Sequence, residues 1–520
     1  MASSPTTRTY EEALRLLSQL QSNKAVTNLF TPPTSTTTTT KPAVDLNALA
    51  IPEMHAWLRR AGYTPADLSA LRCVHVSGTK GKGSVSALTA SILTRWWQHQ
   101  QQQQQQHVVV GPVGTYSSPH VASVRERIAV DGRPVDRETF ARYFFEVWDR
   151  LSEAAVREDG VAAGEAAGPS TKPFYFRFLT ILALHVFVRE GCRSAVVECG
   201  IGAEYDATNV LPEGAVTAAV VTQLGVDHVA MLGGTVEEIA WHKAGVFKRG
   251  VRAFTRGAGP GREGVMEVLR GRAAEKGAVL VEVDDAEVEA WGGVADAALQ
   301  GPFQKYNMAL AVAAAREHIL RLGGRFDGEF AKDDYPLRSM PPEFEAGLRE
   351  ATLRGRCEVY VDGDGVEWFL DGAHTEDSLA GIGQWFASRA AGPDVRRVLL
   401  FNQQDRDPAA LLPALLASSK AGIGSARAFE YAVFTRNEEK MPAAGEPSRD
   451  LAVQTKACEV MRNFDPETRC VTQAAVEPSM ELVRGFAREA KEEGKHCKVL
   501  VTGSFHLLGA VIKSIEHVEC

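Results

Sequence analysis

The fold of this chain is decided by residues 73–84, which read Cys73-Val74-His75-Val76-Ser77-Gly78-Thr79-Lys80-Gly81-Lys82-Gly83-Ser84. An apolar, β-branched run leads into a glycine-rich turn, and a segment typical of a helix follows. Glycine lets consecutive N–H groups point inward, and the helix adds its positive N-terminal end. We expect a phosphate cradle in which Lys82 reaches the β- and γ-phosphates and the Ser84 hydroxyl faces Mg²⁺. The plainer alternative is a flexible turn between a strand and a helix.

The spacing of this loop differs from that of the common P-loop. The common form, G-x-x-x-x-G-K-[ST], would need a glycine at Val76 and a hydroxyl at Gly83. The form found here, G-T-K-G-K-G-S, resembles the ATP loop of the Mur-ligase superfamily. Its Gly83 spacer is similar to that of the folate-using branch, the folylpolyglutamate synthases.

Composition limits the classes of function. The 520 residues carry 57 basic and 65 acidic side chains, a net charge of −8, with 45% hydrophobic content. This balance gives no reason to expect nucleic acid or an anionic membrane as the main partner. The eight cysteines form no C-x-x-C pair and indicate reduced thiols. No apolar run could span a bilayer and no targeting segment is evident, so we expect a cytoplasmic protein. A mitochondrial form from another start site stays open.

Strands alternate with helical patterns in two series, which indicates α/β architecture. In the first series we expect strands at 73–76, 108–116, 194–199 and 216–224, with helices after Ser84, Pro173 and Thr235. In the second we expect strands at 358–361, 367–370, 398–401, 431–435 and 498–502. The sequence thus predicts an N-terminal P-loop-type, mostly parallel sheet with flanking helices (1–350) and a smaller Rossmann-like α/β domain (351–520). Low-complexity or small-residue segments predict mobile insertions near 31–45, 98–107 and 158–171.

Two strand ends carry metal-binding side chains. Glu198 follows an apolar strand and opens the pattern E-x-G-x-G-x-x-x-D-x-T-N through Asn209. A carboxylate at a buried strand end beside a phosphate loop is a usual Mg²⁺ ligand. The next strand is expected to end in Gln223-Leu224-Gly225-Val226-Asp227-His228. The pattern resembles the same family, in which the matching Glu and His hold a second Mg²⁺. A lone histidine is otherwise more often structural.

Lys243 lies in a helical pattern that begins with a capping box, Thr235-Val236-Glu237-Glu238. A helical lysine is normally a solvated surface charge, but this one stands in an apolar stretch. The stretch resembles the family's I-A-x-x-K-A-G, in which the lysine is carbamylated and supplies oxygen near the metals. A free ammonium would be repelled by two Mg²⁺ ions, so the modification is electrostatically reasonable.

Two further motifs resemble folate and magnesium determinants of the family. Ser117-Ser118-Pro119-His120, followed by Arg125-Glu126-Arg127, is similar to the T-S-P-H…R-E-R-I signature. Ser118 matches a serine that contacts the first Mg²⁺. The arginines suit an anionic glutamate tail, or are plain surface charges. The aromatic run 174–178 offers a stacking surface for a pterin or simply forms core.

The nucleotide determinants that the resemblance implies lie in the second half of the chain. Gln304 and Asn307 match the H-Q-x-x-N element, with Phe303 in place of histidine. Arg356 in Leu353-Arg354-Gly355-Arg356 matches an arginine that reaches ATP. Asp371 and His374 match D-G-A-H, near the ribose and phosphates.

The resemblance as a whole implies an ATP-dependent ligase of folate and one-carbon metabolism that adds L-glutamate to the γ-carboxyl of tetrahydrofolate and its polyglutamates through an acyl phosphate. It further implies ATP, two Mg²⁺ sites, a carbamylated Lys243, room for a monovalent cation, and a monomer. The implied catalytic residues are Lys82, His228, Lys243 and Arg356. The implied nucleotide-binding residues are Gly78, Thr79, Lys80, Gly81, Lys82, Gly83, Ser84, Gln304, Asn307, Arg356, Asp371 and His374. The implied metal-binding residues are Ser84, Ser118, Glu198, His228 and Lys243.

Three alternatives remain open at this point. The first is a dihydrofolate synthase, with the same chemistry on dihydropteroate, or an enzyme with both activities. The second is a cell-wall Mur ligase, which the G-K-G-S and R-E-R-I forms disfavour. The third is an inactive nucleotide-binding switch or scaffold, which the full set of metal-ligand candidates disfavours. ADP release with a pteroate or a folate acceptor would separate them.

Overall fold

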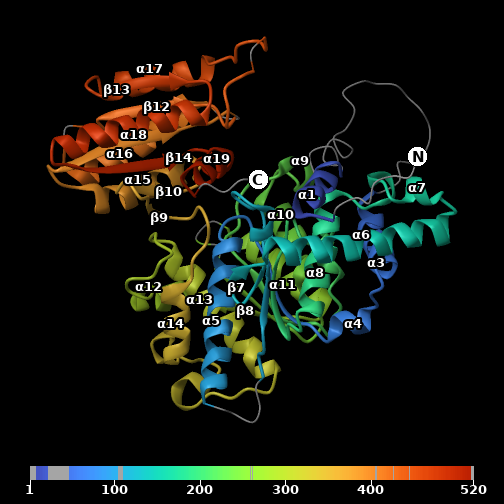
Figure 1. Ribbon diagram of the computed structural model, residues 1–520. Coiled ribbons are helices and arrows are strands. Elements are labelled where there is room, and N and C mark those ends of the chain that lie inside the picture. Colours follow the sequence, from blue (N-terminus) through green and yellow to red (C-terminus); the bar gives the residue numbers. More distant parts are fainter. Residues whose placement is uncertain are drawn as a thin grey trace. The chain divides into compact units, whose positions relative to one another are not determined.

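The computed structural model describes residues 8–20, 46–103, 109–257, 259, 262–404, 407–425, 427–443 and 445–516. The chain divides into two compact units (Figure 1). Unit 1 comprises Met1–Pro119, Arg125–Asp296 and Lys305–Ala351, and unit 2 comprises His120–Val124, Ala297–Gln304 and Thr352–Cys520. The threonine-rich insertion expected at 31–45 lies outside the described residues.

Unit 1 is built on an eight-stranded sheet in the order β4-β3-β2-β5-β1-β6-β7-β8. Six strands run parallel, and β3 and β4 form an antiparallel edge next to β2. The strands are β1 (Arg72–Ser77), β2 (Val113–Tyr116), β3 (Ile128–Val130), β4 (Arg133–Pro134), β5 (Ser194–Glu198), β6 (Val216–Val221), β7 (Arg252–Arg256) and β8 (Val279–Val283). The expected mostly parallel sheet is confirmed, while β3, β4, β7 and β8 were not predicted.

Helices follow the strands of unit 1, as the alternation predicted. They are α1 (Tyr10–Ser18), α3 (Leu46–Arg60), α4 (Pro65–Ser69), α5 (Lys82–Gln102), α6 (Arg137–Asp159), α7 (Ala163–Ala166), α8 (Tyr175–Arg189), α9 (Val229–Leu232), α10 (Val236–Lys243), α11 (Glu263–Lys276), α12 (Asp285–Trp291), α13 (Gln304–Arg321) and α14 (Pro342–Glu350). Helices α10 and α11 share a buried apolar cluster with β6 that includes Val221, Phe247 and Leu269. Helix α14 packs on α5, where a Cβ on Gly347 would lie 2.6 Å from the Ile92 Cα.

Two of the insertions expected in unit 1 are in part ordered structure, so those predictions were wrong in part. Helix α5 continues through the first glutamines to Gln102, because glutamine is a good helix former and can extend an existing helix. The segment expected as a loop at 158–171 contains α7 and a 3₁₀ turn, Pro169–Thr171. The buried Lys172 amine binds the carbonyl oxygens of Ala166 and Gly168, at 2.7 and 3.2 Å, and holds this segment closed.

Unit 2 is a three-layer α/β/α unit on a six-stranded sheet in the order β13-β12-β11-β14-β10-β9, parallel except for β9. The strands are β9 (Glu358–Val361), β10 (Glu367–Leu370), β11 (Val395–Phe401), β12 (Tyr431–Thr435), β13 (Arg469–Gln473) and β14 (His496–Thr502), and the helices are α15 (Glu376–Ala390), α16 (Pro408–Ile423), α17 (Ala452–Phe464), α18 (Val476–Glu492) and α19 (Phe505–Glu516). Alternate strand residues bury one face under α15, α16 and α17, and the other under α18 and α19. Five of the six strands were predicted; β13 was missed.

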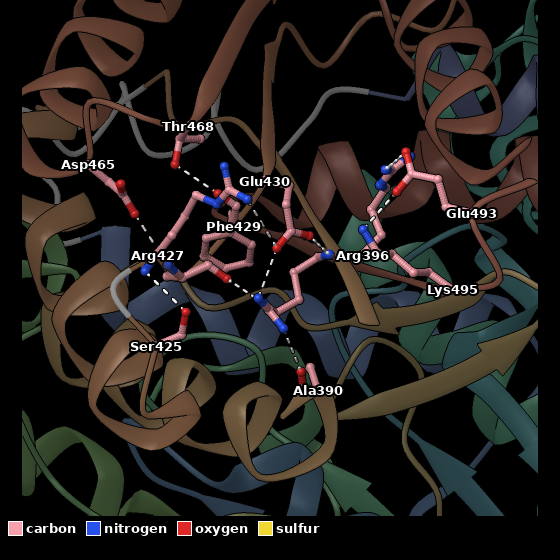
Figure 2. Close-up of polar contacts among 12 residues, drawn as sticks. Ala390, Arg396, Ser425, Arg427, Phe429, Glu430, Asp465, Thr468, Glu493 and Lys495 are labelled. Carbon is pink, nitrogen blue, oxygen red and sulfur yellow. Dashed lines mark hydrogen bonds and ion pairs between the residues drawn. The ribbon is translucent and has the colours of Figure 1, made fainter. Parts of the chain in front are cut away.

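Charged side chains tie together the amino-terminal edge of this sheet (Figure 2). The buried Arg397 guanidinium pairs with Glu430 at 2.9 Å and also donates to the Ala428 carbonyl at 3.0 Å. Arg396 pairs with Glu493 at 2.7 Å, and the Thr468 hydroxyl donates to the Phe429 carbonyl at 2.8 Å (Figure 2). These contacts lie opposite the carboxyl ends of the strands, which leaves that edge for ligands.

Two general expectations can be compared with the described residues. The seven cysteines among them are all free thiols, and six of the seven are buried. None of the helices in the described ranges is both long enough and apolar enough to cross a bilayer.

Candidate active site

The glycine-rich loop connects β1 to α5 and is held by the chain that follows β6. The backbone N–H groups of Thr79 and Lys80 both donate to the Gln223 carbonyl, each at 3.0 Å. The Thr79 hydroxyl donates to the Gly225 carbonyl at 3.0 Å. The loop therefore has a defined shape, set by a segment more than 140 residues later in the chain.

Two glycines of the loop occupy positions that no other residue could take without displacement. Gly78 has φ +139°, and a Cβ there would lie 1.8 Å from Thr222 Oγ1. Gly81 has φ +91° at the N-cap of α5, and its Cβ would lie 2.6 Å from Asn307 Oδ1. Asn307, expected near the nucleotide, thus lies against the loop. Thr222 was not predicted, and it also donates to the Lys80 carbonyl at 2.8 Å.

Two lysine amines converge on one carbonyl oxygen of the loop. Lys82 Nζ donates to the Gly78 carbonyl at 3.0 Å, and Lys243 Nζ donates to the same oxygen at 2.7 Å. Lys82 was predicted to bind phosphate, and the structure places its amine at the loop. Lys243 comes from α10, far along the sequence, and the structure brings it to the same place.

Lys243 is buried, with 2% of its surface exposed, at the end of α10. The predicted capping box is confirmed, because Thr235 and Glu238 bond each other's backbone N–H groups. The Ser77 hydroxyl donates to the Lys243 carbonyl at 2.7 Å and ties the helix end to β1. Burial first, and then the nearby Lys82 charge, lower the pKa of Lys243 to about 7.

Glu198 lies at the end of β5, paired in register with Val76 of β1, and is 3% exposed. Its Oε2 accepts a 3.1 Å hydrogen bond from the Ser118 backbone N–H, so two predicted metal-binding residues lie together. Ser84 is buried in the first turn of α5. These hydroxyl and carboxylate oxygens fit Mg²⁺, which prefers hard oxygen donors.

A ready-made metal cage is absent from the part of the chain that the structure describes, since no three His, Cys, Asp or Glu side chains are grouped there as metal ligands would be. This finding does not conflict with a magnesium site. Mg²⁺ beside phosphates usually takes one or two protein carboxylates and keeps several waters.

His228 does not end a strand, and this prediction was wrong. Strand β6 ends at Val221, and His228 adopts a left-handed conformation, φ +51°, before α9. Its backbone N–H donates to Asp227 Oδ1 at 2.9 Å, an interaction that helps a non-glycine residue hold this conformation. Burial lowers the pKa of His228, Asp227 raises it, and the Lys243 and Lys82 charges lower it further.

The residues expected to bind folate divide into core and surface. Phe176 and Phe178 are buried in the core. Of the two alternatives, a stacking surface for a pterin or core packing, these two residues therefore follow the second. Tyr175 is half-buried, with the Arg127 guanidinium 5.7 Å from its ring centroid. Arg125 donates to the Val135 carbonyl at 3.0 Å. Both arginines are thus partly engaged within unit 1.

In unit 2 the predicted nucleotide residues surround the end of β10. Asp371 is buried and accepts 2.8 Å bonds from the backbone N–H groups of Cys357 and Ala373. Burial raises its pKa, and the nearby Arg356 guanidinium opposes that rise. The Arg356 guanidinium also lies 4.5 Å from the Phe505 ring centroid. His374 Nδ1 is 3.0 Å from the Gly372 carbonyl.

A buried polar chain beneath the glycine-rich loop was not predicted. His75 Nε2 lies 2.9 Å from Thr208 Oγ1, which donates to Asp206 Oδ1 at 2.6 Å. Asp206 Oδ2 accepts from the backbone N–H groups of Gly200 and Ile201, each at 3.0 Å. The D-x-T-N part of the pattern that begins at Glu198 could have indicated this chain, because Asp206 and Thr208 fix the turn that follows Glu198.

A cavity of about 120 Å³ lies beyond the ends of β6 and β7, and nothing in the sequence indicated it. Apolar residues of α11 and two arginines contribute to its lining. The lining residues are Thr222, Gln223, Leu224, Val236, Thr255, Arg256, Gly257, Gly259, Arg262, Val265, Met266 and Leu269. Arg256 is engaged by Asp285 and stacks 3.6 Å from the Tyr306 ring centroid.

Solved structures share this architecture. Mycobacterium tuberculosis folylpolyglutamate synthase, complexed with ADP and AMPPCP, gives a TM-score of 0.64 at 23% identity, covering 90% of this chain and 96% of that one. Escherichia coli FolC, in complex with DHPP and ADP, gives 0.59 at 20% identity over 99% of both chains. The similarity confirms the expected fold, two mostly parallel α/β sheets with flanking helices.

Sequence comparison identifies the family. A family model described as "Dihydrofolate synthetase, C-terminal domain" matches residues 357–514. A curated folylpolyglutamate synthase of Saccharomyces cerevisiae is 36% identical over 526 residues, covering 98% of this chain and 88% of the yeast protein. With a shaped glycine-rich loop, two lysines at its first glycine and a carboxylate on the neighbouring strand, the chain belongs to the folylpolyglutamate synthase family of ligases.

Proposed function

We propose that this protein adds L-glutamate to the γ-carboxyl of tetrahydrofolate and of its polyglutamates, with hydrolysis of ATP to ADP and phosphate. The observation that carries the proposal is the loop at residues 78–84. Its backbone is fixed by the Gln223 carbonyl, and its Gly78 carbonyl accepts a hydrogen bond from the Lys82 amine. Family membership supplies the folate substrate class.

The reaction has two steps. In the first, a γ-carboxylate oxygen of the folate attacks the γ-phosphorus of ATP, the bond to the bridging oxygen breaks, and ADP leaves. In the second, the amine of L-glutamate attacks the acyl carbon, phosphate leaves, and the nitrogen loses a proton. The protein's main tasks are to position the reactants and to stabilise the charge that develops on oxygen.

The residues of unit 1 divide this work. Backbone N–H groups of residues 81–84 would bind the phosphates, because those of Thr79 and Lys80 donate to the Gln223 carbonyl. Lys82 would move from the Gly78 carbonyl to the β- and γ-phosphate oxygens. Ser84, Ser118, Glu198 and His228 are proposed to hold Mg²⁺. Bound Mg²⁺ would neutralise phosphate charge and orient the phosphates.

Lys243 is proposed to carry a carbamate. Its burial and its position at the loop support this, because an uncharged amine there avoids repulsion from Lys82 and can add CO₂. Its contact with the Gly78 carbonyl supports a second task, which is to fix the peptide that opens the loop.

Five further residues are proposed to contact ATP, without a separate task for each. Asn307, against Gly81, is proposed to contact ATP together with Gln304. Arg356, Asp371 and His374, gathered at the end of β10 in unit 2, are proposed to contact the ribose and phosphates. Arg356 would add positive charge for the transferring phosphoryl group.

A second candidate activity is dihydrofolate synthesis, the same chemistry on dihydropteroate. It is favoured by one finding, the dihydrofolate synthetase description of the family model that matches unit 2. Purified protein should be given ATP, Mg²⁺ and L-glutamate with either tetrahydrofolate or dihydropteroate. We expect ADP release and products one glutamyl unit heavier with tetrahydrofolate. Release with dihydropteroate alone would replace the first proposal by the second.

A further inference from the structure

Four carboxamide side chains form one head-to-tail hydrogen-bonded chain in unit 2. Gln454 Nε2 donates to Asn402 Oδ1 at 2.9 Å, and Asn402 Nδ2 donates to Asn437 Oδ1 at 2.7 Å. Asn437 Nδ2 then donates to Gln404 Oε1 at 3.1 Å. The chain spans the carboxyl ends of β11 and β12 and the first turn of α17. We call it the amide chain.

The direction of the amide chain is set by the backbone. Gln454 Nε2 also donates to the Thr435 carbonyl at 3.3 Å, and a carbonyl oxygen can only accept. Turning Gln454 over would place oxygen against oxygen there. Once Gln454 is fixed, each following amide has one orientation that satisfies its neighbour, and every donor points toward Gln404.

The amide chain therefore ends in a donor at Gln404. Gln404 Nε2 and, at the other end, Gln454 Oε1 have no hydrogen-bond partner among the described residues. A buried polar atom without a partner costs free energy, and such atoms often mark a ligand. Each amide polarises the next, so the terminal N–H is a stronger donor than that of an isolated amide.

The position of Gln404 separates it from the nucleotide residues. Asp371 and His374 follow β10, whereas Gln404 follows β11, and β14 lies between these strands. Two strand spacings amount to about 10 Å. Gln403 Nε2 joins the two regions through the Gly503 carbonyl at 3.1 Å. Gln404 thus lies at the same carboxyl-terminal edge of the sheet as the nucleotide residues but apart from them. We take it to meet a reactant other than ATP.

We propose that Gln404 Nε2 binds a carboxylate of the incoming L-glutamate, and that Asn437, Asn402 and Gln454 are positioning residues that aim it. A carboxylate carries acceptors only and matches a polarised donor. An arginine at this position would also attract the phosphates of ATP, whereas a neutral amide can bind the carboxylate without doing so. The inference rests on the proposed ligase activity and adds the residue that recognises the amino acid.

The test uses the full chain and steady-state kinetics with each substrate varied in turn. Gln404→Glu keeps the acceptor for Asn437 and removes only the terminal donor, so the rest of the amide chain stays intact. We expect the KM for glutamate to rise about 10-fold or more, with the KM for ATP and for tetrahydrofolate within about twofold. Gln404→Met removes the donor without adding charge and should shift the same constant.

Gln473→Glu is the matched control. Gln473 ends β13 at the same edge of the sheet and lies outside the amide chain, so the added charge alone should change no KM. The positioning role has its own readout in Asn437→Asp. A carboxylate at 437 cannot donate to Gln404, but its protonated form can, so the KM for glutamate in this variant should fall as pH is lowered.

The outcomes separate the inference from the proposed function. Absence of glutamate-dependent ADP release by the wild-type protein would overturn the proposed function itself. An active wild type whose Gln404→Glu and Gln404→Met variants keep the KM for glutamate within twofold would overturn only the inference. A rise confined to the KM for ATP would also overturn it, because Gln404 would then face the nucleotide.

Discussion

A Cβ atom on Gly78 would lie 1.8 Å from Thr222 Oγ1 and 2.9 Å from the Thr222 backbone nitrogen. Gly78→Ala must therefore displace either the first residue of the glycine-rich loop or Thr222, which directly follows β6, and it also strains a backbone at φ +139°. We expect turnover to fall about 100-fold or more. Gly234→Ala is the control, because its Cβ would meet open space. ADP release measures both, and normal turnover of Gly78→Ala would contradict the proposed role of the loop.

Lys82→Ala should lower turnover by about 10³-fold or more, because a cation that stabilises transition-state charge is worth several kcal/mol. Its melting temperature should change little, since Lys82 is only half-buried. Lys332→Ala, which removes an exposed lysine paired with Glu329, serves as the control. Retention of more than a tenth of the wild-type rate would show that Lys82 does not meet the phosphates.

Lys243 is predicted to gain a carbamate when the protein is kept in bicarbonate. Native mass spectrometry should show the added CO₂ in the wild type and not in Lys243→Met. Lys243→Ala should be inactive and in part rescued by formate or acetate, which supply the missing oxygens. If Lys243→Ala and Lys243→Met both turn over normally, neither the carbamate nor the contact with Gly78 matters for the reaction.

The buried His318 makes stability depend on pH. Its ring lies between Thr217 Oγ1, at 2.6 Å, and Ser194 Oγ, at 2.9 Å, and burial lowers its pKa from 6.5 to about 3. Below pH 6.5 the unfolded chain binds a proton that the folded chain does not, so stability falls as pH drops from 6.5 toward 3. At pH 5 the loss reaches up to about 2 kcal/mol relative to pH 7.5. Urea unfolding of wild type and His318→Gln at both values checks this, with a smaller difference expected for the variant.

The Arg397–Glu430 pair is predicted to stabilise unit 2. Arg397→Met removes the 2.9 Å side-chain partner of the largely buried Glu430 carboxylate, which keeps only the Arg397 backbone N–H and the Arg427 guanidinium at 3.9 Å. We expect a loss of about 3 kcal/mol in the free energy of unfolding, the lower end of the range for a broken buried pair. Lys456→Met breaks the half-exposed pair with Asp407 and should cost less than about 1 kcal/mol. Urea unfolding followed by tryptophan fluorescence measures both, and equal effects would contradict the distinction between buried and exposed pairs.

The sequence predicted those parts of the fold whose signal is local. Strands β1, β5 and β10 are short apolar runs that end in chemically informative residues, and the Thr235 capping box marks a helix start. Strand β13, Arg-Cys-Val-Thr-Gln, was missed because its half-buried positions give no continuous apolar run. His228 was placed on a strand because left-handed conformations leave little trace in an apolar pattern.

Contacts between distant segments account for most of the rest of the site. That Thr222 faces Gly78, and that Asn307 faces Gly81, depends on how the chain after β6 and the start of α13 meet the loop. The amide chain joins residues 402, 404, 437 and 454, none of which stands in a motif that specifies its partner. Residue types at motif positions could be predicted, whereas their mutual distances required the folded chain.

The two hydrogen bonds that Gln223 accepts from Thr79 and Lys80 have a consequence for nucleotide association. Because the loop is already shaped by the chain behind it, binding does not have to order it, and little conformational entropy is lost on association. The rate of nucleotide capture should then be governed by diffusion and charge rather than by loop rearrangement. The same two N–H groups are committed to Gln223, so phosphate must be met by the amides from Gly81 onward. A substitution that frees Thr79 and Lys80 would slow association even if every phosphate-binding group remained.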